Sequence, residues 1–414
     1  MYPRIPPDQR PTSAPDSFWP AHCPNPECVA HLATPATYRH GIEYTKDGGY
    51  RRKAPPFRIQ RFVCTLCDAS FSTQTFSVTY RMKRPENLLP VARMLTNGEA
   101  DRHARRTLLP NARYAPRPNA GCAGSTVTRL VPRLAREAML FLTELESGST
   151  GIREPLVLDD FVTFARLQLN QVSLPTVVGR RTSYVYHLDQ AAHRRGGTLT
   201  ESQRAAEREL LRRRCFPRDA RRRAWRRVID ALLERAEAGA TLACASDGDP
   251  VIAEVLAAAG PRVRHTAYPN PDRGPKGAPR SEEALVRDSA LFEVDLFHRW
   301  LRHSQAHDRR ETIAFARSVN ALLGRRILFA AARNAIQARR ERADDGITPA
   351  MVRGLVDRAM SWDEILERRR FPRRVAALPR RWDACFAEAI PTLGRPSSKR
   401  RFPQFARRGT GFRG

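Results

Sequence analysis

The chain has 414 residues, enough for two to four domains at roughly 100–200 residues each, and 41% of them are hydrophobic, which suffices for a buried core. Its 72 Lys and Arg against 43 Asp and Glu give a net charge of +29, which favours a polyanionic partner, with nucleic acid first. No apolar run approaches the ~18 residues of a membrane-spanning helix and residues 1–10 carry no secretory pattern, so we expect a cytoplasmic, nucleoid-associated protein without a membrane partner.

Two cysteine pairs mark the N-terminal segment, residues 15–84. Four residues separate Cys23 from Cys28, and two separate Cys64 from Cys67. A disulfide framework is not expected without secretion, whereas two closely spaced pairs supply the four thiolates of a tetrahedral zinc site. The segment therefore predicts a zinc ribbon that holds structural Zn²⁺, and the metal would supply much of its folding free energy.

The residues around the cysteines fit a ribbon. Residues 58–63 predict a strand that enters the second pair, Phe71 is placed to pack beneath the metal, and Asp47-Gly48-Gly49 predicts a hairpin turn. Two alternatives stay open: the cysteine pairs are structural without metal, or a histidine replaces one cysteine, the candidates being His22, His31 and His40.

Residues 85–148 predict a small helical module. A first helix begins near Asn87, a Gly/Pro/Asn-rich stretch covers 110–124, and a second helix begins at Ser125 with Val127, Leu130, Leu134, Ala138 and Phe141 on its apolar face. The polar start of this second helix, which includes Arg129, is typical of a recognition helix that enters DNA. We expect a helix-turn-helix; the alternative is an ordinary helical linker bundle.

Residues 152–340 change to a strand-rich pattern. Three successive strands are predicted at 156–164, 172–178 and 182–188, and two more at 241–246 and 263–267, with a helix at 250–259 between them. An arginine-rich helical insertion occupies 200–238, and helices dominate from 284 onward. This order predicts a mixed α/β domain of the ribonuclease H-like type, followed at 341–414 by a basic helical or disordered region.

Two acids fall on strands that would be neighbours in such a sheet. Asp159 lies in the first strand and Asp247 ends the fourth, so their carboxylates would face each other. Such a pair can bind Mg²⁺, which combines few carboxylates with water and substrate phosphate oxygens, and paired ions promote phosphodiester chemistry. The alternatives are a helix N-cap role for Asp247 and a solvent-exposed strand position for Asp159.

Over roughly residues 20–340 the chain resembles bacterial insertion-sequence transposases with a zinc ribbon, a helix-turn-helix and a DDE catalytic domain. The ribbon carries one part of this resemblance. A second part is the strand 158–164 (Leu-Asp-Asp-Phe-Val-Thr-Phe) followed by Ser246-Asp247-Gly248, and a third is 295–302 (Asp-Leu-Phe-His-Arg-Trp-Leu-Arg) followed by 309–318 (Arg-Arg-Glu-Thr-Ile-Ala-Phe-Ala-Arg-Ser).

The resemblance implies a third acid and a reaction. The catalytic Glu of the family falls on Asp295, so Asp159, Asp247 and Asp295 would hold Mg²⁺ or Mn²⁺. Glu311 is the alternative third acid, Glu293 is a more remote one, and His298 replaces a family Asn beside the acids.

The implied function is metal-dependent cleavage and strand transfer at the ends of an insertion sequence. The implied partners are double-stranded DNA, as terminal repeats and target, and further copies of the chain in a synaptic complex. Two alternatives stay open: a catalytically inactive, domesticated zinc-dependent DNA-binding protein, and a ribonuclease H-like nuclease without strand transfer.

Basic side chains are expected to contact DNA phosphates, which gives affinity rather than sequence choice. The candidates are Arg222 and Arg226 in the arginine-rich insertion and Arg302 after the third acid; the alternative for the insertion is a solvated helix face. The segment 395–414, with seven Lys and Arg and no acid, is expected to become ordered only on DNA.

Overall fold

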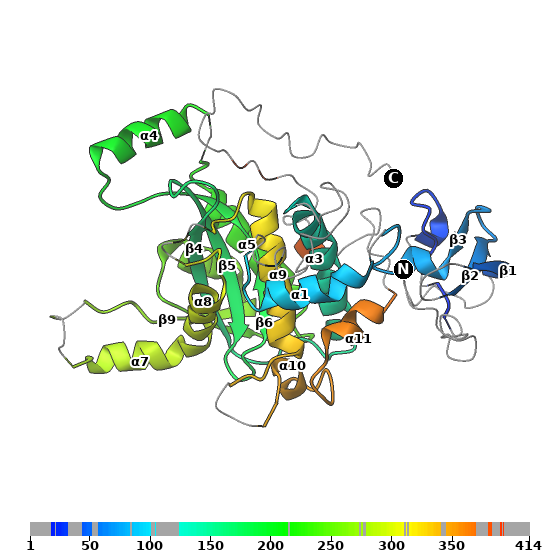
Figure 1. Cartoon of the computed structure of the whole chain (residues 1–414). Coiled ribbons are helices and arrows are strands. Elements are labelled where there is room, and N and C mark those ends of the chain that lie inside the picture. The colour runs from blue at the N-terminus through cyan, green and yellow to red at the C-terminus, as the bar shows by residue number, and fades with distance from the viewer. Residues whose placement is uncertain are drawn as a thin grey trace. The chain divides into compact units, whose positions relative to one another are not determined.

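The computed structural model describes residues 18–20, 22–31, 44–51, 57–82, 85–100, 104, 124–213, 216–272, 275, 279–309, 312, 314–340, 345–369, 380–382, 390 and 392. The chain divides into two compact units (Figure 1). The first comprises Met1–Leu89 with Asp363–Leu378, and the second comprises Pro90–Trp362 with Pro379–Gly414. Each unit is described by itself. Within the described residues, no helix combines the length and the apolar character needed to cross a membrane.

The first unit contains a three-stranded antiparallel sheet. Its strands are β1 (Tyr44–Arg51), β2 (Arg58–Cys64) and β3 (Ser70–Ser72), paired in the order β1-β2-β3, with short 3-10 turns η2 (Val29–His31) and η3 (Thr73–Phe76) beside them. Buried aromatic side chains and cysteines share one core, in which Phe71 stacks on Phe62. Phe71 therefore packs in the cysteine core, as predicted.

The predicted hairpin turn at Asp47-Gly48-Gly49 is wrong. These residues lie inside β1, whose pairing with β2 continues from Tyr44 to Arg51 with a register shift between Lys46 and Gly49. Gly48 has a φ of +57°, and a Cβ on Gly49 would lie 2.6 Å from the Ile59 carbonyl oxygen. A bulge demands the same small residues as a tight turn, so the local sequence does not separate the two.

The second unit is built on a six-stranded mixed sheet, which confirms the predicted mixed α/β class. The strands are β4 (Leu156–Phe164), β5 (Asn170–Gly179), β6 (Val185–Leu188), β7 (Ala191–Arg194), β8 (Leu242–Ser246) and β9 (Val263–Ala267). Their order is β6-β5-β4-β8-β9, with β7 paired to β5. Strand β4 is antiparallel to β5 and parallel to β8, and β8 is parallel to β9.

The apolar runs explain why these segments are strands. Residues 156–158 of β4 and 172–179 of β5 are buried, as expected for central strands that are covered on both faces. Five of the strands were predicted, whereas β7 was missed because four residues with a half-exposed pattern carry little periodicity.

The structure describes ten helices, of which only some pack against this sheet (Figure 1). In chain order the described ones are α1 (Leu88–Thr96), α3 (Gly124–Ser147), α4 (Glu201–Leu211), α5 (Ala220–Leu233), α6 (Pro250–Ala258), α7 (Glu282–Ala290), α8 (Phe292–Ser304), α9 (Val319–Ala335), α10 (Pro349–Val352) and α11 (Trp362–Glu367), with 3-10 turns η4 (Pro85–Asn87), η6 (Gly260–Arg262) and η7 (Arg380–Trp382). Helix α8 packs on β4 and β5, while α5 packs on β5, β6 and β7.

Helix α3, the expected recognition helix, belongs to the same compact unit as the sheet. Its predicted apolar face is buried, and the helix packs along α9. At their contact, a Cβ on Gly324 of α9 would lie 3.1 Å from the Ala135 Cβ, so glycine permits the close approach. Arg129 is exposed on α3, and residues 105–123, where the turn of a helix-turn-helix was expected, lie outside the described residues.

Candidate functional site

The four paired cysteines converge, as the sequence predicted. The Sγ atoms of Cys23 and Cys67 are 3.6 Å apart, those of Cys28 and Cys64 are 3.8 Å apart, and all four lie within 4.8 Å of one another. A tetrahedron with metal–sulfur bonds of about 2.3 Å has sulfur–sulfur edges of about 3.8 Å. The four thiols therefore fit the geometry of a tetrahedral metal ion, and they can hold one.

Each cysteine pair is presented by a turn. In the first, the Cys28 amide donates to the Asn25 carbonyl oxygen at 3.1 Å; in the second, the Asp68 amide donates to the Cys64 carbonyl oxygen at 2.9 Å. Asp68 adopts a left-handed φ of 56°, which reverses the chain directly after the second pair. Short spacing is what makes such turns possible, and it is why this site was readable from the sequence.

The electrostatics of the thiols favour a bound cation. Burial raises the pKa of Cys23 and Cys64. Although desolvation opposes it, hydrogen bonds led by the Ala69 amide lower the pKa of Cys67 to about 7. A divalent cation is the natural compensation for several thiolates at this separation.

Neither described histidine of this segment replaces a cysteine in the cluster. The Nδ1 atom of His31 donates to the Cys23 carbonyl oxygen at 2.6 Å, and His22 packs edge-on against His31. Burial, followed by the charge of His31, lowers the pKa of His22 to about 4. His40 lies outside the described residues.

A second candidate site lies where β4 and β8 run side by side. Leu158 pairs with Ser246 in the parallel register, so the next residues, Asp159 and Asp247, occupy adjoining positions. Burial first, and the negative charge of Asp159 second, raise the pKa of Asp247. The two acids named from the sequence are thus neighbours, and their repulsion is a cost that a cation would relieve.

Each of the two carboxylates is oriented by polar neighbours. The Nδ1 atom of His298 in α8 lies 3.3 Å from the Asp159 Oδ2 atom. The Nε2 atom of the same ring is buried and has no hydrogen-bond partner in the described part of the chain. The side chain of Asn270 donates to Asp247 Oδ2 at 3.3 Å, and the backbone amide of Asp249 donates to Asp247 Oδ1 at 3.1 Å.

The N-cap role considered for Asp247 belongs to Asp249. The Asp249 side chain accepts from the amides of Val251 and Ile252, and Pro250 begins helix α6. Asp247 is left with an oxygen that faces Asn270 and with the charge of Asp159 nearby. It is therefore available to a ligand at the end of the strand.

Asp295, the predicted third acid, is engaged by an arginine. It forms an ion pair with Arg287 of α7. Burial lowers the pKa of Arg287, but the hydrogen bond to Asp295 and the charges of Asp295 and Asp159 outweigh it and raise that pKa. The guanidinium thus supplies positive charge beside the acids. Among the described residues, the cysteines form the only group of three or more potential metal ligands that lie so close together.

The two alternative third acids lie elsewhere. The Glu293 Oε2 atom accepts from the Ser183 hydroxyl at 2.6 Å, which turns this carboxylate toward the segment between β5 and β6. Glu311 lies outside the described residues.

Asp160, next to Asp159, has an unrelated set of partners. It accepts from the Ser173 hydroxyl at 2.6 Å and from Trp225 Nε1 at 3.2 Å, and it pairs with Arg221 at 2.5 Å. Arg221 also pairs with Asp249 at 2.8 Å. Successive strand residues point to opposite faces, so Arg221 compensates Asp160 while Asp159 faces the candidate site. No feature of the sequence identified Arg221 as this partner.

The arginines expected on DNA fall into two kinds. The guanidinium of Arg302 donates to the carbonyl oxygens of Val162 and Asp308, at 2.5 and 2.9 Å, and lies 4.2 Å from the Phe161 ring centre. These contacts of Arg302 hold α8 against β4. Arg226 and Arg129 are exposed.

Helix α5 is less strongly positive than its sequence indicated. Arg222 pairs with Glu254 at 2.7 Å, Arg223 with Asp219 at 2.7 Å, and Arg227 with Asp189 at 2.9 Å. Together with Arg221, most of the arginine run has internal acidic partners.

Comparison with known proteins found no matching family model and no curated protein of significant similarity.

Proposed function

We propose that the protein is a DNA transposase of the DDE type, which cleaves DNA at the ends of an insertion sequence and joins the freed 3′-hydroxyl to target DNA. The observation that carries the proposal is the parallel register that makes Asp159 and Asp247 neighbours. The strand order β6-β5-β4-β8-β9, with β4 antiparallel to β5 and parallel to β8, is the order of a ribonuclease H-like sheet and supports that assignment.

The residues around the paired acids suit hard divalent cations. Carboxylate oxygens are the ligands that Mg²⁺ and Mn²⁺ prefer, and the raised pKa of Asp247 reflects a cost that such a cation would remove. When bound, these ions would activate the attacking oxygen and stabilise the leaving one. His298 and Asn270 hold the two carboxylates in orientation.

In this proposal Asp295 contributes once its ion pair with Arg287 is exchanged. The pair links α7 to α8, and Asp295 shares a helix face with His298 at the i, i+3 spacing. Asp295 thus stands one turn before the histidine that contacts Asp159. Glu311 remains the alternative third acid.

The cysteine cluster is proposed to hold structural Zn²⁺ and to form part of the DNA-recognition region. The net charge of +29 supports a polyanionic partner, and Arg129 and Arg226 are exposed basic candidates for phosphate contacts. Terminal-repeat and target DNA, and a homo-oligomeric synaptic complex, are proposed from the resemblance.

The test uses the full-length protein with duplexes taken from the flanks of its own gene. We expect strand cleavage with Mg²⁺ or Mn²⁺, followed by joined products when target DNA is present. Asp159→Asn and Asp247→Asn should each abolish cleavage, whereas Asp272→Asn, an exposed acid in the loop after β9, should not. Cleavage that survives Asp247→Asn would contradict the proposal. Cleavage without joined products would identify a nuclease that lacks strand transfer.

The ion pair between Asp295 and Arg287 favours a second candidate function, that of a zinc-dependent DNA-binding protein without catalytic activity. Arg287 neutralises the acid that the reaction would need, as in a site that no longer binds metal. In that case the protein would bind DNA tightly and would cleave it with neither metal. The Asp247→Asn variant would bind DNA with the same affinity as the unsubstituted protein.

A further inference from the structure

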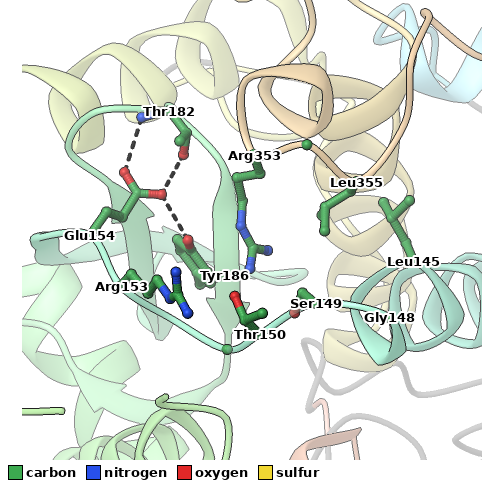
Figure 2. Close-up of a pocket in the computed structure, with 12 residues that line it drawn as sticks. Leu145, Gly148, Ser149, Thr150, Arg153, Glu154, Thr182, Tyr186, Arg353 and Leu355 are labelled. Atoms are coloured by element: carbon green, nitrogen blue, oxygen red, sulfur yellow. Dashed lines mark hydrogen bonds between the residues drawn. The ribbon is translucent and has the colours of Figure 1, made fainter.

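A pocket of about 440 Å³ opens in the second unit, away from both sites described above (Figure 2). It lies among the end of α3, the segment that leads into β4, the turn between β5 and β6, and the residues that follow α10. Its volume falls within the range of small-molecule sites, about 300–1,000 Å³. The apolar part of its wall is formed by Leu145 and Leu355.

Arg353 points into this pocket (Figure 2). Its guanidinium lies 4.5 Å from the ring centre of Tyr184 and 4.6 Å from that of Tyr186, so two aromatic faces hold it in place. Its Nη1 atom is buried and has no hydrogen-bond partner among the described residues. The described residues therefore leave donor capacity of this guanidinium unused, and the half-buried side chain as a whole lines the pocket.

Glu154, the acid that shares the pocket wall, is hydrogen-bonded to other described residues than Arg353. The carboxylate of Glu154 accepts from the Thr182 hydroxyl, the Tyr186 hydroxyl and the amides of Arg181 and Thr182, at 2.5 to 3.0 Å. Its acceptor capacity is thus used by the protein itself. The other arginine of the wall, Arg153, pairs with Glu237 at 2.6 Å.

The opposite side of the pocket offers a small polar rim. Figure 2 shows Thr150 and Ser149 across the pocket from Arg353. A Cβ built on Gly148 would meet no atom within 4 Å, so the backbone of the rim is open there, whereas Gly151 packs against the backbone of Glu237. A hydroxyl and a forked guanidinium on facing walls suit an oxyanion with several acceptor oxygens.

We propose that this pocket binds the phosphate group of a phosphomonoester, with Arg353 as its anchor. The guanidinium donates to the phosphate oxygens, Thr150 donates from the facing side, and the organic part of the ligand packs on Leu145, Leu355 and the Tyr186 ring. Such a phosphomonoester is either a free nucleotide or the 5′-phosphate at the end of a DNA strand. The inference is independent of the proposed transposase activity.

The test is calorimetric titration of the full-length protein with inorganic phosphate and with adenosine monophosphate. We expect saturable binding of both, and an affinity at least roughly tenfold lower for Arg353→Gln, the usual effect of losing a charged hydrogen-bond donor. The matched control is Arg180→Gln. It removes an exposed arginine that lies in the turn between β5 and β6 but does not line the pocket, so the affinity for both phosphate compounds should stay unchanged.

Two further variants protect the test from a folding defect. Arg353→Lys keeps a cation over the tyrosine rings but lacks the fork, and Thr150→Val removes the facing hydroxyl with little change in volume. We expect both to fold with an unchanged circular dichroism spectrum and to bind adenosine monophosphate several-fold more weakly. If either binds as tightly as the unsubstituted protein, the assigned contact is wrong.

The two sources of phosphate are separated with one oligonucleotide made with and without a 5′-phosphate. Because the two forms share every internal phosphate, non-specific DNA binding cancels in the comparison. Tighter binding of the 5′-phosphorylated form that depends on Arg353 identifies a strand end, and equal binding with retained nucleotide affinity identifies a free nucleotide. The proposal is overturned if no phosphate compound binds at millimolar concentration, or if acetate binds more tightly than phosphate.

Discussion

Arg287 forms an ion pair with Asp295, and Asp295 lies one helical turn before His298, the residue that contacts Asp159. A protein cation therefore stands beside the acids that the sequence singles out for divalent metal. This relationship separates the two functions considered above, because a catalytic site with Asp295 as its third acid needs that carboxylate to be released from Arg287, and an inactive protein does not.

The first prediction concerns this ion pair. Arg287→Gln removes a positive charge beside Asp159 and Asp295, so the affinity for Mn²⁺ should rise by roughly tenfold. Calorimetric titration with Mn²⁺ measures it. Arg280→Gln, which removes an exposed arginine paired with Asp288, is the control and should leave the affinity unchanged. Weaker Mn²⁺ binding by Arg287→Gln would show that the arginine supports the site instead of competing with the cation.

The second prediction separates two adjacent acids. Asp160→Asn leaves the partly buried Arg221 with one carboxylate partner in place of two, so the free energy of unfolding should fall by about 2–3 kcal/mol. Asp159→Asn removes repulsion toward Asp247 and should leave stability unchanged or slightly higher. Urea denaturation measures both. Equal destabilisation by the two substitutions would mean that their side chains do not have the separate roles assigned here.

The third prediction is the pH dependence of stability at Asp247. Because burial and the charge of Asp159 raise its folded-state pKa, the folded protein binds this proton more tightly than the unfolded chain. Stability relative to Asp247→Asn should therefore fall as the pH rises from about 4 through the raised pKa, and then stay level toward about 7. Denaturation of both proteins across this range without metal is the measurement. A difference that does not change with pH contradicts the assigned shift.

The fourth prediction concerns the cysteine cluster. The purified protein should contain one zinc ion per chain, bound by the four clustered thiols. Cys28→Ser or Cys64→Ser should lose the metal and unfold the first unit, because this small core depends on it. Elemental analysis and circular dichroism provide the readouts. Cys244→Ser, a buried cysteine of β8 outside the cluster, should retain zinc. Full zinc content in Cys64→Ser would exclude the proposed ligand set.

The fifth prediction distinguishes a structural arginine from an exposed one. Arg302→Gln should lower the free energy of unfolding by about 2 kcal/mol, because two backbone acceptors and the Phe161 ring lose their partner. Arg226→Gln should leave stability unchanged, weaken DNA binding, and reduce the salt dependence by about one phosphate contact. Fluorescence anisotropy at several salt concentrations tests the second part. If Arg302→Gln instead weakened DNA binding without loss of stability, Arg302 would be a DNA contact.

The features that the sequence predicted correctly depend on local order. The clustering of the four cysteines was predictable, because each pair occupies one turn and two turns suffice for a tetrahedral site. Five strands followed from apolar runs, and the proximity of Asp159 and Asp247 followed from the expectation that their strands are neighbours. The hairpin at Gly48 failed because a bulge and a turn require the same residues.

The tertiary structure alone decided which charges meet. Arg287 pairs with Asp295, Arg221 with Asp160, and Arg302 with backbone carbonyl groups of Val162 and Asp308. In each case an arginine reaches a partner on a different helix, strand or loop. The angle and offset at which these elements pack select that partner, and hydrophobic periodicity specifies neither. The sequence by itself therefore determined which segments form most of the sheet and which thiols cluster where they could hold a metal ion, because those depend on neighbouring residues. Packing determined whether each arginine is exposed, pairs with a carboxylate or contacts backbone carbonyl groups.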